Sequence, residues 1–102
     1  YYNKELNGIK GVEVLHNKNE GSYWIYTIKV NNQKRFMGTM EKKGIMVSRI
    51  HERNDKHSCV KQYKRELPNL DKLVNQMICI PVGWWLSKED REYIANTIKE
   101  GW

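Results

Sequence analysis

Residues 48–59, SRIHERNDKHSC, concentrate chemically active side chains in consecutive positions. The stretch holds two histidines, two arginines, a lysine, two acids, an asparagine and a cysteine. Arginine recognises phosphate in a planar, bidentate fashion, and histidine adds a neutral donor or acceptor near pH 7. These residue types predict contact with an anionic, polyhydroxylated ligand, which the stretch would hold without transforming it.

Three other interpretations of residues 48–59 are open from composition. The first is a solvated loop whose charges pair with one another. A metal site built from the two histidines, Asp55 and Cys59 is disfavoured, because three cations would repel a dication and His-x5-His is no zinc spacing. A Cys59 nucleophile is disfavoured because its base would normally come from a distant position. We therefore expect no metal ligand and no catalytic residue here.

The distribution of charge favours a local anion site. The chain has 18 Lys and Arg against 12 Asp and Glu, a net charge of +6. Residues 48–65 alone carry six cationic and two acidic side chains, so most of the excess lies in one place. Nucleic acid is the alternative ligand, because Tyr23, Trp24 and Tyr26 could stack bases on a strand. The Lys/Arg-Gly-Phe/Tyr pattern of an RNA-binding strand is absent, so nucleic acid is disfavoured.

The length of 102 residues is enough for one domain with a single modest core. A hydrophobic fraction of 39% with six Tyr and four Trp argues against disorder. No apolar run approaches the roughly 18 residues of a membrane span. Two cysteines outside any CxxC pattern indicate reduced thiols, so we expect a cytoplasmic protein without a membrane partner. Because YYNKELNG begins as though partway through a helix, we expect residues 1–102 to be one domain of a longer parent, with residues 1–8 ending a connecting helix.

The spacing of apolar residues predicts a two-layer α+β domain, a small, mainly antiparallel sheet of three or four strands with helices on one face. Strands are expected at residues 12–15, 22–30, 45–50 and 77–82, with a turn at 16–21. In the second strand, alternation places Trp24 on the same face as Tyr26, Ile28 and Val30. Helices are expected from a cap at Asn31 or Asn32 to Gly44, from Pro68 with Leu70, Leu73 and Val74 inward, and from a capping box at Ser87 to about Glu100 with Ile94 and Ile98 inward.

Four consecutive pieces of this sequence resemble the C-terminal domain of the DegT/DnrJ/StrS family of PLP-dependent nucleotide-sugar aminotransferases. They are the strand YWIYTIKV, the helix QKRFMGTMEKKGI, the strand and loop MVSRIHERNDKHSC, and the ending LPNLDKLVNQMICIPVGWWLSKEDREYIANTIKE. The resemblance covers residues 23–100, and YYNKELNGIKGVEV fits the preceding part of the family. The sequence departs from the family at residues 48–59, where a Pro-Leu-His-like run is commoner.

The resemblance implies a parent that aminates a keto-sugar nucleotide and works as a homodimer. Its N-terminal domain would carry PLP and the Schiff-base lysine, so this chain alone is expected to bind no cofactor and to be inactive. The C-terminal domain would help to wall the substrate cleft. By this resemblance the substrate-binding residues are Arg49, His51, Arg53, Asn54 and His57, with Asn54 and Asp55 also shaping the turn. The alternative is a stand-alone basic module for nucleic acid or a phosphorylated ligand.

Trp84 and Trp85 place two large apolar side chains in a turn that follows a buried strand. They could seal the end of the core, wall a ligand cleft, or contact another domain. The sequence leaves these three interpretations open.

Overall fold

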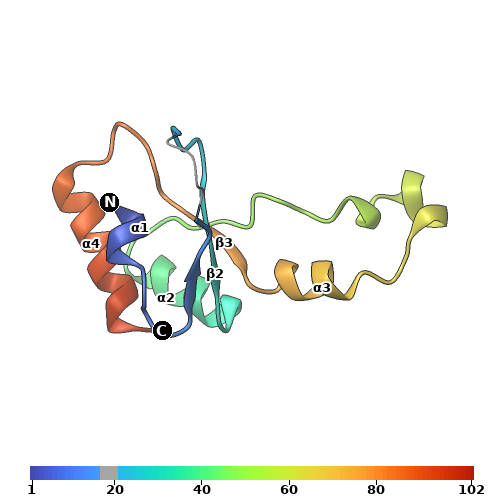
Figure 1. The fold of residues 1–102 in the computed structure, drawn as a ribbon, viewed down its shortest axis with the longest axis horizontal. Helices are drawn as coiled ribbons and strands as arrows, with labels where there is room; N and C mark the ends of the chain where they lie inside the picture. The colour runs from blue at the N-terminus through green and yellow to red at the C-terminus, as the bar shows by residue number, and fades with distance from the viewer. Residues whose placement is uncertain (17–20) are drawn as a thin grey trace.

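The computed structural model describes residues 1–16 and 21–102, so most of the predicted turn at 16–21 lies outside the described residues. Within them, the strands β1 (Val12–Val14), β2 (Tyr26–Val30) and β3 (Met77–Ile80) form one antiparallel sheet in that order. The helices α1 (Tyr2–Glu5), α2 (Gln33–Lys42) and α4 (Lys88–Glu100) accompany the sheet, whereas α3 (Pro68–Val74) lies well away from it (Figure 1). The prediction of a small two-layer α+β domain is confirmed.

The core lies between the sheet and the helices α1, α2 and α4. Alternation along the central strand β2 turns Tyr26, Ile28 and Val30 to one face, and all three are buried. The helices pack their apolar residues against this face, namely Leu6, Phe36, Met40, Ile94, Ala95 and Ile98. The inward orientation predicted for the α4 isoleucines is confirmed.

Both long helices begin and end as the sequence predicts. The Asn32 side chain accepts a hydrogen bond from the backbone N–H of Arg35, and Gly44 follows α2 with a φ of +72°. At α4, the Ser87 hydroxyl accepts from the Asp90 N–H at 3.0 Å and the Asp90 carboxylate accepts from the Ser87 N–H at 2.9 Å. The capping box is complete although Asp replaces the usual Glu or Gln.

The predicted strand over residues 22–30 is too long. β2 begins at Tyr26, which pairs with the last residue of β3, Ile80, so the residues before Tyr26 have no strand to pair with. Trp24, predicted to share a face with Tyr26, Ile28 and Val30, is 88% exposed as a result, whereas those three residues are buried. The predicted strand over residues 77–82 likewise ends early, at Ile80.

The strand predicted over residues 45–50 is wrong. This segment meets the sheet at a single isolated bridge, between Ser48 and Cys79, and then leaves it. The bridge explains why Cys79 is buried although it faces away from the core: Ser48 and Thr27 cover it. β3 is thus covered on both faces, as its apolar sequence predicts.

Residues 49–76, which we call the arm, leave the sheet after Ser48 and return to it at Met77. Figure 1 shows the arm extending away from the sheet and the other helices, and the molecule measures 48 × 31 × 25 Å along its principal axes. The arm contains two 3-10 helices that the sequence analysis missed, η1 (Asn54–Lys56) and η2 (Ser58–Tyr63), followed by α3. No arm residue is buried, and Leu70, Leu73 and Val74 are half-buried rather than in the core. At its returning end the arm contacts a core helix, because the Gln33 side chain of α2 donates a hydrogen bond to the Val74 carbonyl at 3.2 Å.

Trp102 closes one end of the core. Its ring meets Phe36 edge-on with 5.0 Å between centroids, and its Nε1 donates to the Asn31 carbonyl at 2.7 Å. Trp102→Ala should lower the free energy of unfolding by about 1–3 kcal/mol, less than a fully buried aromatic because the ring is half-buried. Urea unfolding measures the change. Trp84→Ala, at a side chain that is 93% exposed, should change the free energy of unfolding by less than about 0.5 kcal/mol. Equal losses of stability in the two variants would contradict the placement of Trp102 at the end of the core.

Candidate functional site

The sheet fixes the base of the arm. The backbone N–H of Ser48 donates to the Cys79 carbonyl at 3.1 Å, and the N–H of Cys79 donates to the Ser48 carbonyl at 2.9 Å. Arg49 follows directly, so its backbone is held beside β3, an edge strand of the sheet. The first residues of the predicted site are therefore positioned by tertiary pairing rather than by a strand of their own.

A cavity of about 210 Å³, which we call the arm cavity, lies where the arm leaves the sheet and α3 returns to it. Its lining consists of Arg49, His51, Glu52, Arg53, Lys56, Val74 and Met77. Three of the five predicted substrate-binding residues therefore share one cavity: Arg49, His51 and Arg53. The sequence analysis missed Val74 and Met77, whose distance along the chain from residue 49 hid their proximity.

Arg53 joins the first half of the arm to α3. Its Nε and Nη2 donate to the two carboxylate oxygens of Asp55 at 2.8 and 2.6 Å, and its Nη1 donates to Asp71. The hydrogen bonds that Arg53 donates to Asp55 raise the pKa of Arg53 and lower the pKa of Asp55. The side chains of Arg53 and Asp55 are each 15% exposed. Because carboxylates already engage these nitrogens, contact between Arg53 and a substrate stays a prediction.

Arg49 is the cation of the arm cavity that is left for a ligand. Lys56 pairs with Glu52 at 3.3 Å and Arg53 is held by two carboxylates, whereas Arg49 has no carboxylate partner within residues 1–16 and 21–102. Arg49 and the neighbouring His51 are both exposed. A guanidinium without a counter-ion beside an imidazole suits an anion that also carries hydrogen-bonding groups.

Asn54 and His57 lie farther along the arm and do not line the arm cavity. The Asn54 carbonyl accepts from the backbone N–H of His57 at 3.3 Å, which closes the single turn of η1. Asp55 shapes this turn through its side-chain bonds to Arg53. The structure thus separates the predicted residues into a group at the base of the arm and a pair nearer its tip.

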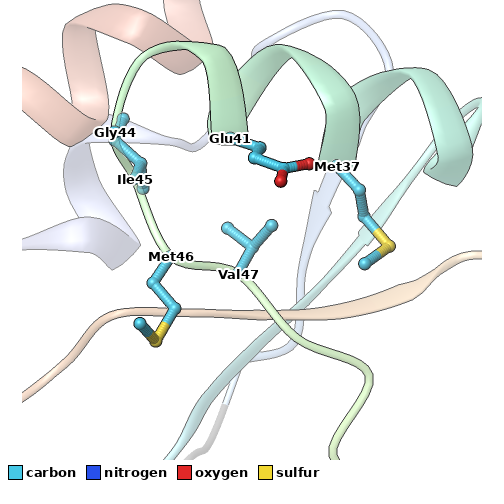
Figure 2. Close-up of a pocket in the computed structure, with 6 residues that line it drawn as sticks. All are labelled: Met37, Glu41, Gly44, Ile45, Met46 and Val47. Atoms are coloured by element: carbon cyan, nitrogen blue, oxygen red, sulfur yellow. The ribbon is translucent and has the colours of Figure 1, made fainter.

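A larger cavity of about 430 Å³ lies between α2 and the segment that follows it. Figure 2 shows Glu41 and Val47 pointing into the space between the helix and this segment, with Met37 and Met46 at its borders. Glu41 is the one ionisable side chain in its lining, so an anionic ligand would be repelled. The arm cavity is therefore the better candidate for an anion.

The arm cavity does not fit PLP. A Schiff-base lysine must lose its proton, which an apolar, desolvated pocket favours. Lys56, the lysine that lines the cavity, is 59% exposed and paired with Glu52. Among the described residues, no group of three or more His, Cys, Asp or Glu side chains could hold a metal ion, and no helix is long and apolar enough to cross a membrane.

Of the three aromatic side chains considered for stacking nucleic-acid bases, Tyr23 and Trp24 are exposed and Tyr26 is buried. Tyr26 is 4% exposed, and its hydroxyl donates to the Asn3 side chain. Its ring lies against the rings of Tyr2 and Tyr23, with centroids 5.2 Å away in each case. Tyr26 therefore serves the core rather than a base-stacking surface.

Comparison with known proteins agrees with the fold. The sequence model of the DegT/DnrJ/EryC1/StrS aminotransferase family matches residues 1–99. The structure is similar to those of the sugar aminotransferase CalS13 from Micromonospora echinospora (43% identity, 99% of this chain, TM-score 0.93) and of AtS13 from Actinomadura melliaura (44%, 99%, 0.93). A DegT DnrJ EryC1 StrS aminotransferase from Brucella abortus has the same fold at 22% identity over 97% of this chain, with a TM-score of 0.84. No curated protein matches the chain.

The chain spans 28% of the length of each of these three solved chains. The matched part is their C-terminal region, which contains the same small sheet and helices. The predicted resemblance is confirmed over nearly the whole chain, including residues 1–22. The chain belongs to the DegT/DnrJ/EryC1/StrS aminotransferase family.

Proposed function

We propose that the chain is the C-terminal domain of a PLP-dependent aminotransferase that aminates a keto-sugar nucleotide. The observation that carries the proposal is the Arg49 guanidinium, which lines the arm cavity of an aminotransferase-family chain and has no carboxylate partner among the described residues. A nucleotide sugar is an anionic, polyhydroxylated ligand, which is the chemistry that residues 48–59 predict. PLP and the Schiff-base lysine would belong to the part of the parent enzyme outside this chain. In this proposal the parent enzyme is cytoplasmic and forms a homodimer.

In this proposal the predicted residues have different roles. Arg49 binds a phosphate of the nucleotide sugar, because its guanidinium is exposed and has no carboxylate to release. His51, two residues on, donates or accepts a hydrogen bond to the same ligand. Arg53 positions the arm through Asp55 and Asp71. Asn54 and His57 complete the wall of the substrate cleft from nearer the tip of the arm.

The division of labour between this chain and the rest of the parent can be tested directly. The full-length protein should bind PLP, with the absorbance of an internal Schiff base, and should transfer an amino group to a keto-sugar nucleotide. The 102-residue chain alone should do neither, because its cavity lysine is exposed and paired. A Schiff-base band in the pure 102-residue chain would contradict the proposal, as would a full-length protein that binds no PLP.

The role of Arg49 can be tested in the full-length enzyme. Arg49→Ala should raise KM for the nucleotide sugar by about tenfold and change kcat less, because the lost contact exists in the ground state and the transition state alike. Lys61→Ala removes the same charge from the arm at a residue outside the cavity, and its KM should stay close to that of the unaltered enzyme. An equal increase of KM in both variants would mean that Arg49 acts only through the net charge of the arm and does not contact the substrate.

A further inference from the structure

A third cavity, of about 510 Å³, which we call the aromatic cavity, lies where α1, the start of β2 and the loop between β3 and α4 meet. Its lining includes Tyr1, Tyr2, Tyr23, Tyr26, Trp84 and Arg91. Figure 1 shows α1 and the N-terminus beside α4, with the arm extending from the other side of the sheet. The aromatic cavity is therefore separate from the arm cavity, and the proposed function assigns it no role.

The aromatic cavity continues into an exposed apolar surface. Trp84 is 93% exposed and Trp85 64% exposed, and the two rings meet edge-on with 6.1 Å between centroids. These exposures contradict the interpretation that the pair seals the end of the core. Two adjacent tryptophans in water are costly for a soluble domain and are typical of a surface that another protein part covers.

The polar groups of the aromatic cavity are not all satisfied within the described residues. The Tyr2 hydroxyl is buried and has no hydrogen-bond partner there, and a buried unpaired hydroxyl costs free energy. The Tyr26 hydroxyl, in contrast, donates to Asn3. The Arg91 guanidinium lies over the Tyr1 ring, 5.5 Å from its centroid. The cavity thus offers aromatic walls and a cation, which together fit an apolar side chain beside a carboxylate or carbonyl oxygen.

We propose that the aromatic cavity and the Trp84–Trp85 pair dock the N-terminal part of the same aminotransferase chain. The inference rests on the proposed function, because this chain covers 28% of the matched enzymes and 72% of their length remains to be packed. Tyr1 itself lines the cavity, so the polypeptide that precedes the matching residue in those enzymes reaches the domain at this surface. A domain tethered there has a high effective concentration, which favours it over a second copy or a free ligand.

Limited proteolysis of the full-length holoenzyme tests this docking. Trp84→Ala should raise the rate of cleavage at the junction just before Tyr1 by about tenfold, because it removes a central aromatic contact and lets the two parts separate more often. Trp84→Phe, which keeps an aromatic ring, should restore most of the protection. Trp24→Ala is the matched control, since Trp24 is 88% exposed and does not line the aromatic cavity, and it should leave the rate unchanged.

Each other outcome overturns the inference. Unchanged cleavage in Trp84→Ala would mean that the cavity serves another occupant, such as a small molecule. Equal acceleration by Trp24→Ala would show that the docking surface is not centred on this cavity. The PLP absorbance of the same samples is measured in parallel, so a holoenzyme without PLP would refute the proposed function while the cleavage rates still report on docking.

Discussion

Met40→Ala should lower the free energy of unfolding by about 2–5 kcal/mol, whereas Met46→Ala should change it by less than about 0.5 kcal/mol. The two residues are of one type and stand six positions apart, but Met40 is 0% exposed and Met46 is 85% exposed. Removing the Met40 side chain leaves a cavity between α2 and the buried face of the sheet, which the surrounding residues fill only in part. A domain of this size is stable by about 5–15 kcal/mol in total, so the loss would be a large fraction.

Urea unfolding of the 102-residue chain, followed by far-UV circular dichroism, measures both changes. The midpoint should fall for Met40→Ala with little change in the slope, because the surface exposed on unfolding stays similar. Met40→Leu, which keeps most of the volume, should cost less than about 1.5 kcal/mol. A comparable loss in Met46→Ala would mean that the segment after α2 contributes to the core more than its exposure indicates.

Arg53→Ala in the full-length enzyme should raise KM for the nucleotide sugar by about tenfold or more, through the position of the arm. The arm has no buried residue, so the bonds from Arg53 to Asp55 and Asp71 are its main described link between η1 and α3. Asp71→Asn should raise KM in the same direction. The double variant should be little worse than Arg53→Ala alone, because both changes break one link.

The same experiment separates positioning from direct contact. If the Arg53 guanidinium bound substrate phosphate itself, Asp71→Asn would free it, and KM would stay the same or fall. Lys72→Ala, next to Asp71 on α3, controls for a change of charge.

The pKa of Asp55 is lowered from 3.8 in the folded chain. The contribution of Asp55 to the stability of the arm is therefore present above that value and is lost as the pH falls through the lowered pKa. Resistance of the arm to an acid-active protease should drop over that range, and Arg53→Ala should remove the dependence.

The arm and the aromatic cavity lie at different places on a small sheet, and both expose groups that a lone domain does not need. An arm without a core of its own should open locally at low cost, which suits a segment that closes on a ligand. The Trp84–Trp85 surface suits a permanent contact, because burial of large apolar side chains contributes most to the free energy of association when water is excluded permanently. In our two proposals, therefore, the arm contacts the substrate and the Trp84–Trp85 surface contacts the rest of the enzyme.

Sequence reasoning identified the elements whose signals are local. The Asn32 cap, the glycine at position 44 and the capping box at Ser87 depend on residues within one helical turn, and all three were predicted correctly. β2 was found by its alternation of apolar residues and β3 by its nearly continuous apolar run, which are the signals of burial on one face and on both faces of a sheet. The strand predicted over 45–50 failed because an extended apolar segment becomes a strand only where a partner runs beside it, and β3 meets it at Ser48 alone.

The candidate site was predicted only in part, because closeness in sequence is a local signal, whereas the contacts of its side chains also depend on distant residues. Arg49, His51 and Arg53 were singled out by their types and closeness in sequence, and the structure places all three in one cavity. The partners that decide what each can do are distant: Asp71 engages Arg53, and Val74 and Met77 supply the apolar wall. No pattern around residue 49 encodes those contacts, because they arise when α3 folds back along the arm.

The sequence by itself determined the fold class, the family and the place where anion-binding chemistry is concentrated, because these depend on residue types and on periods of a few residues. Only the tertiary structure decided that Arg53 is bound by carboxylates while Arg49 has none beside it in the described part of the chain, and that Trp84 and Trp85 are exposed rather than in the core. The physical reason is that charge pairing and burial depend on which distant segments come within a few ångströms of one another. That proximity is a property of the folded chain as a whole.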